Sequence, residues 1–97
     1  MTDIQNKINQ AFERFLLTTN TYFSKKDLES IAVEYGAETA IQIKKIYDDA
    51  IDAPIDWRTA TMDSALETMH DFLNREYPWL SQKARANINY AFIMTWK

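Results

Sequence analysis

Glu67 and His70 are side chains whose types and spacing could bind a metal ion. They stand three positions apart on an expected helix, and helical carboxylate–metal centres combine two such pairs with two further glutamates. The chain has 1 histidine, so a second pair could come only from a second copy. On a helical wheel His70 falls at the edge of the apolar face and Glu67 toward solvent. This pattern favours a histidine that covers the core, with a metal enzyme assembled in a dimer as an alternative.

A second pattern with possible chemistry is Asp48-Asp49-Ala50-Ile51-Asp52. It is similar to the Asp-Asp-x-x-Asp motif with which isoprenoid synthases hold Mg²⁺ against a diphosphate. Those enzymes enclose their substrate in a much larger helical barrel than 97 residues can build. The three aspartates also fall on the polar side of their helix, where no enclosed pocket is expected. The resemblance ends after these five residues and predicts no catalytic site.

Other catalytic and cofactor-binding patterns are missing from the sequence. There is no cysteine, and the chain has a single glycine, so neither a thiolate nucleophile nor a glycine-rich phosphate loop is available. Ser24, Ser64 and Ser81 are each better explained as helix caps. We therefore expect a protein that is not an enzyme and that needs no cofactor.

Charge is distributed unevenly along the chain. The segment from Asp48 to Glu76 carries eight acids and two bases, although the whole chain has a formal net charge of only −3. This balance gives no basic footprint for direct nucleic-acid binding. One acidic surface would instead steer a basic partner toward it. The alternative interpretation is an ordinary solvated helix face.

We predict that this acidic surface binds another protein that has a basic surface. The most concrete hypothesis is an acidic inhibitor or immunity-type protein that masks the basic site of a nuclease or another nucleic-acid-handling partner. Trp57 lies inside the acidic segment and is either a core plug or an interface anchor, because tryptophan is frequent at binding hot spots. A further alternative is a regulatory or oligomeric helical domain. The predicted partner-binding residues are Asp48, Asp49, Asp52, Asp56, Trp57, Asp63, Glu67 and Asp71.

The elements that must position these residues are helices, because apolar residues recur with a period of 3.6 and no period-2 alternation is present. The first helix is expected after Asp3 as N-cap. The second is expected after Ser24, with Asp27 at the third position and Phe23 and Leu28 as a hydrophobic staple. Gly36, the single glycine, should end it.

Three more helices are expected in the second half. One runs over residues 37–52 and is ended by Pro54, and Lys44 or Lys45 can pair with acids along it. Another helix has begun by Ser64 and ends before Pro78. Its exact start is open, because Asp56, Thr59, Thr61 and Ser64 are all candidate N-caps. The last follows Ser81.

The last stretch, residues 80–97, has apolar side chains on all sides, which predicts a helix enclosed by others at the centre of the bundle. Lys83 and Arg85 make its start too charged for a membrane span. Asn87 and Asn89 should find hydrogen-bond partners inside it.

The sequence therefore predicts an all-α fold: one compact domain over residues 1–97, built as a bundle of about five helices with a buried C-terminal helix. The first residues lack a charged region followed by an apolar one, so no signal peptide is expected and the cytoplasm is the predicted location. No membrane partner is expected, and the oligomeric state stays open.

Overall fold

The first helix starts one residue earlier than the sequence indicates. In the computed structural model, which describes residues 2–17, 19–53 and 55–96, α1 spans Asp3–Phe15 and is capped by Thr2. The Thr2 hydroxyl accepts a hydrogen bond from the Gln5 backbone N–H at 3.3 Å, and the Gln5 side chain accepts one from the Thr2 N–H at 3.0 Å. The prediction of Asp3 as cap was wrong because Thr2 and Gln5 form a complete capping box, which leaves Asp3 in the first turn.

The start of α2 (Lys25–Tyr35) is as predicted: Ser24 and Asp27 cap each other reciprocally. Gly36 ends α2 and directly precedes α3 (Ala37–Ile51). Its φ of 103° lies in the region that side chains with a Cβ rarely adopt. The single glycine therefore makes the tight corner between these two helices possible.

The starts of α4 (Met62–Glu76) and α5 (Gln82–Trp96) are set by hydroxyl caps. Thr61 caps α4 together with Ser64, which resolves the competition among the four candidates. Ser81 caps α5 as predicted, since its Oγ accepts a hydrogen bond of 3.1 Å from the Ala84 N–H. The helix α4 stops before Pro78 as expected, whereas Pro54 lies outside the described residues.

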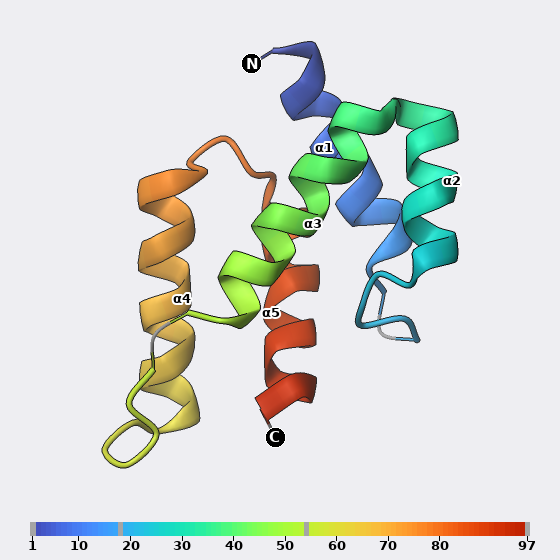
Figure 1. The fold of residues 1–97 in the computed structure, drawn as a ribbon. Helices are drawn as coiled ribbons and strands as arrows, with labels where there is room; N and C mark the ends of the chain where they lie inside the picture. The colour runs from blue at the N-terminus through green and yellow to red at the C-terminus, as the bar shows by residue number, and fades with distance from the viewer. Residues whose placement is uncertain (1, 18, 54, 97) are drawn as a thin grey trace.

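The helices pack as a flattened bundle in which α1, α3 and α5 contact one another, α2 covers one side and α4 the other (Figure 1). The prediction of an all-α, single-domain bundle is confirmed, and the described residues contain five helices and no strand. Among these helices, α3 is the one that touches all four others. The expectation that the C-terminal helix occupies the centre was therefore wrong, because α5 makes no contact with α2.

The helix α5 is buried on one side and exposed on another. Ala84, Ile88, Ala91 and Phe92 are fully buried, whereas Tyr90 and Met94 are 37% and 45% exposed. Enclosure on all sides was predicted from the apolar circumference, but neighbours cover only the faces toward α1, α3 and α4. One face of α5 therefore belongs to the core, and another exposes the large side chains of Tyr90 and Met94.

Two asparagines attach α1 to the C-terminal part of the chain. The buried Asn9 side chain donates to the Trp79 carbonyl at 3.2 Å and accepts from the Ser81 N–H at 2.8 Å. Asn87 donates to the Phe12 carbonyl at 3.3 Å, as predicted. The same prediction was wrong for Asn89, whose buried Oδ1 has no hydrogen-bond partner in the described part of the chain.

Within the stretches that the structure describes, no helix combines the length and apolar character that crossing a bilayer requires.

Candidate binding surface

The carboxylates of α3 form ion pairs along their own helix. Lys44 reaches Asp48 at 2.7 Å, and Lys45 reaches Asp49 at 2.9 Å, which are the pairs that the spacing predicts. The Tyr77 hydroxyl also lies 3.4 Å from the Asp49 carboxylate. The hydrogen bonds to Asp49 and then to Tyr77 raise the pKa of Lys45 above its usual value. Asp49 thereby links α3 to the connection between α4 and α5.

The connection between α3 and α4 presents Asp56 as an acceptor for a guanidinium. Arg58 donates from Nε to Oδ1 at 3.1 Å and from Nη2 to Oδ2 at 3.3 Å. These side-chain hydrogen bonds, followed by one from the Arg58 backbone N–H, lower the pKa of Asp56. Both side chains are largely exposed, so the pair lies at the surface.

Trp57, between these two residues, packs on the core and also remains accessible. Its ring stacks on Phe92, with centroids 6.3 Å apart, and lies against Trp96 at 5.6 Å. Phe92 is fully buried, whereas Trp57 and Trp96 are 38% and 43% exposed. Trp57 therefore covers Phe92, as one interpretation predicted, and it is also partly exposed. Its role as an interface anchor stays a prediction.

The last turn of α5 is fixed against the end of α3. The Trp96 indole N–H donates to the Ile51 carbonyl at 2.9 Å. Nearby, the Tyr47 hydroxyl donates to the Thr21 carbonyl at 2.8 Å. Burial raises the pKa of Tyr47, a hydrogen bond with Thr95 lowers it, and the charges of Asp48 and Asp52 raise it further.

Five residues come from the last turn of α3 and the residue after it, from the α3–α4 connection and from the end of α5, and we call them the aromatic–acidic surface. Its members are Asp48, Asp52, Asp56, Trp57 and Trp96. Four of them belong to the predicted partner-binding set. Trp96 was missed, because an aromatic residue in an apolar helix looks like core until the packing shows which face is covered.

The remaining predicted residues lie elsewhere. Asp63, Glu67 and Asp71 form an exposed row along α4, on the side away from its buried residues Ala65, Met69 and Leu73. Asp71 also borders a cavity of about 290 Å³ between α4 and Ala53. The structure therefore divides the predicted set into the aromatic–acidic surface, the α4 row, and Asp49 beside Tyr77.

The possible metal pair occupies no enclosed site. Glu67 is exposed, and His70 is half-buried at the edge of the α4 packing face. Among residues 2–17, 19–53 and 55–96, no three side chains of metal-binding type come together. The carboxylates of Asp48 and Asp49 each have a lysine as partner. The arrangement offers surface carboxylates for a cationic partner.

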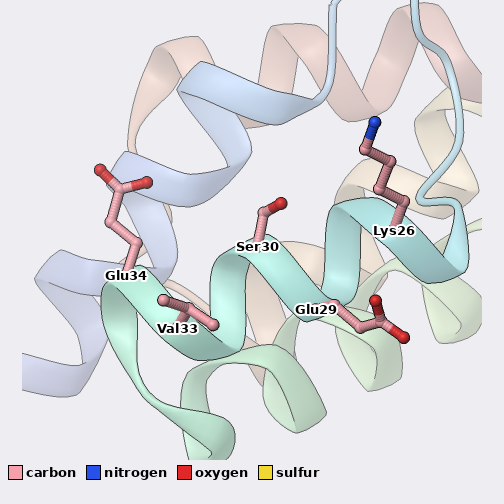
Figure 2. A pocket seen from close by; sticks show the side chains of 5 residues that line it. All are labelled: Lys26, Glu29, Ser30, Val33 and Glu34. Atoms are coloured by element: carbon pink, nitrogen blue, oxygen red, sulfur yellow. The ribbon is translucent and has the colours of Figure 1, made fainter.

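An open groove of about 600 Å³ runs along the outer side of α2. Lys26, Ser30 and Glu34 leave the helix on one side at successive turns, and Val33 projects beside them (Figure 2). Val33 is 90% exposed. The groove combines both charge signs along one helix and has no aromatic side chain, so it lacks the usual composition of a binding hot spot.

Comparison of the chain with protein-family models, with curated proteins and with solved structures finds no match.

Proposed function

We propose that this chain is a non-enzymatic protein-binding module whose working site is the aromatic–acidic surface. The observation that carries the proposal is the pair of adjacent, partly exposed tryptophans beside exposed carboxylates. Tryptophan is over-represented at binding hot spots, where it supplies a large rigid contact area. Carboxylates around it increase the rate of encounter with a basic partner and add selectivity. The partner is therefore a protein with a basic surface.

The most concrete form of this function is an acidic inhibitor or immunity-type protein that masks the basic site of a nuclease or another nucleic-acid-handling protein. Sites that hold nucleic acid are lined by lysine and arginine that contact phosphates. Carboxylates on a rigid helical surface can occupy the same positions as those phosphates. The net charge of −3 supports an acidic ligand for such a site over a protein that binds nucleic acid itself.

The test begins with capture of the partner from the native host and continues with purified components. We expect the binding of wild-type protein to weaken with rising salt and to be competed by duplex DNA. Reversal of the three carboxylates of this surface, Asp48, Asp52 and Asp56, to lysine should weaken binding by about 100-fold, because it replaces attraction by repulsion. Thermal unfolding of the variant should stay near that of wild type, since Asp52 is exposed and the exposed ion pairs of Asp48 and Asp56 contribute little to stability.

A matched variant separates the site from net charge. Reversal of Glu13, Glu29 and Glu38 to lysine produces the same change in charge on α1, α2 and the start of α3. This variant should bind the partner within a few-fold of wild type. Normal binding by the first variant, in a salt-independent manner, would overturn the proposal.

A second candidate function is self-association, which the apolar row on α5 favours. Tyr90 and Met94 lie one turn apart and are both substantially exposed. Sedimentation over a range of concentrations tests this function. A dimer that dissociates when Met94 is replaced by lysine would support an oligomeric helical domain, and a monomer at every concentration would exclude it.

A further inference from the structure

The rings of Trp57 and Trp96 pack against each other, and both residues are partly exposed. The ring of Trp57 stacks on the buried ring of Phe92, which restricts its position. The indole N–H of Trp96 is already used by the Ile51 carbonyl. The exposed part of Trp96 therefore offers its aromatic ring and not its polar group to a ligand. The face of an indole attracts cations, and it does so best for the planar guanidinium of arginine.

The Asp56 carboxylate next to Trp57 is already arranged to receive a guanidinium. Arg58 occupies it with two hydrogen bonds, of 3.1 and 3.3 Å, from two guanidinium nitrogens to the two carboxylate oxygens. These bonds lower the pKa of Asp56. The Arg58 side chain is itself 89% exposed. It is therefore held mainly by this pair, and exposed pairs of this kind are weak enough to exchange partners.

Two kinds of molecule could bind to the aromatic–acidic surface, a second copy of the chain or a basic partner, and their charges distinguish them. A two-fold dimer brings the same patch of both subunits together. Such a dimer here would bring Asp48, Asp52 and Asp56 of one copy toward the same carboxylates of the other. In a complex with a basic protein, each of these carboxylates faces a cation, so the charges attract. Charge complementarity therefore favours a basic partner over a second copy.

We infer that the aromatic–acidic surface receives an arginine side chain of a basic partner, whose guanidinium lies against Trp57 and replaces Arg58 at Asp56. This inference rests on the proposed function, since it names the chemical group by which the partner is anchored. Arg58 then acts as an internal competitor that occupies the carboxylate until the partner arrives. Removal of Arg58 should consequently strengthen binding.

The probe is an acetylated, amidated peptide of alternating glycine and arginine, titrated into ¹⁵N-labelled full-length protein. Its lysine and citrulline counterparts serve as comparison peptides. We expect saturable shifts of the Trp57 and Trp96 indole signals, with the Trp79 indole signal unchanged. Replacement of Trp57 by leucine preserves an apolar cover over Phe92 and removes the aromatic face. It should weaken arginine-peptide binding about 10-fold.

Replacement of Arg58 by glutamine should strengthen binding about 3-fold, because Asp56 is then free. Lys25→Gln is the matched control, since it makes the same change in charge on α2, where the side chain is exposed. Equal effects of the two variants would mean that only net charge matters and would overturn the inference. So would unchanged binding by the Trp57→Leu variant, or equal binding of the citrulline peptide.

The outcomes separate this inference from the proposed function. If a basic protein binds wild type and its binding is lost on reversal of Asp48, Asp52 and Asp56, while the arginine peptide moves no indole signal, the function holds and the arginine anchor is wrong. If the peptide binds as described but no basic protein partner is found, the anchor holds and the proposed function is wrong.

Discussion

The indole N–H of Trp96 donates a hydrogen bond of 2.9 Å to the backbone carbonyl of Ile51. This bond joins the last turn of α5 to the last turn of α3, the helix that contacts all the others. It also holds Trp96 beside Trp57, which comes from the connection that follows α3. The position of the aromatic–acidic surface therefore depends on the pairing of two helix ends that are far apart in the sequence.

Replacement of Trp96 by phenylalanine tests this pairing. The ring contact with Trp57 can persist, but the Ile51 carbonyl loses its donor, so we expect the free energy of unfolding to fall by about 1 kcal/mol. Urea denaturation measures the change. Met94→Leu on the exposed row of the same helix should stay within about 0.5 kcal/mol of wild type. Equal stability of the Trp96 variant and wild type would show that the hydrogen bond contributes nothing.

Replacement of Asn9 by alanine should destabilise the protein more than the substitutions of Asp27 and Glu67 described below. Asn9 is 6% exposed and hydrogen-bonds to the Trp79 carbonyl and the Ser81 N–H, both in the α4–α5 connection. Loss of the side chain leaves these groups without their partner, at a cost of roughly 2–3 kcal/mol. Thermal or urea unfolding gives the value. Asn6→Ala, on the exposed side of α1, is the control and should change stability little.

Asp27 should make stability depend on pH in the acid range. Burial raises its pKa, but hydrogen bonds from Asn20 and Ser24 outweigh this, so the pKa lies below its ordinary value of 3.8. A carboxylate with a lowered folded-state pKa stabilises the protein above its unfolded-state pKa, and this contribution is lost as the pH falls through the folded-state value.

The Asp27→Asn variant should therefore be less stable than wild type at neutral pH, by about 0.5–1 kcal/mol. The difference should shrink as the pH falls below 3.8. Unfolding by urea at a series of pH values measures it. Ser30→Ala on the same helix should follow the wild-type profile, and a difference that grows toward acid pH would contradict the assignment.

Glu67→Lys should stabilise the protein. Glu67 stands between Asp63 and Asp71 on the exposed row of α4, and each like-charged pair at this spacing costs about 0.2–0.5 kcal/mol. The lysine replaces two repulsions by two attractions, so we expect a gain of roughly 0.5–1 kcal/mol in chemical unfolding. Glu29→Lys on α2 brings a lysine toward Lys25 and should have the opposite sign. A loss of stability with Glu67→Lys would indicate that the row has structural partners.

The local features of the fold were accessible from the sequence where a signal lies within a few residues. Ser24 with Asp27, Gly36, Ser81 and the lysine–aspartate pairs of α3 all act within one turn, so spacing alone predicted them. The cap of α1 was misplaced because Thr2 and Asp3 are both good capping residues. Only the complete box with Gln5 distinguishes them.

The surface could be predicted in part. Asp52, Asp56 and Trp57 stood out because acids and an aromatic residue cluster within the connection. Trp96 did not, since its exposure depends on which neighbours reach the end of α5. The α4 row was assigned to the same surface because it is close in sequence, but its side chains point away from the α4 packing face.

The sequence by itself determined that this chain is helical, where most helices begin and end, and that its acids are concentrated in one segment. The helices and their ends follow from interactions between residues a few positions apart, and the distribution of the acids is given directly by the sequence. Only the tertiary structure decided that α3 and not α5 is central, that α5 exposes Tyr90 and Met94, and that Trp96 lies beside Trp57. The reason is physical. An apolar helix face predicts that this face is buried, but which element covers it depends on how all the helices pack together.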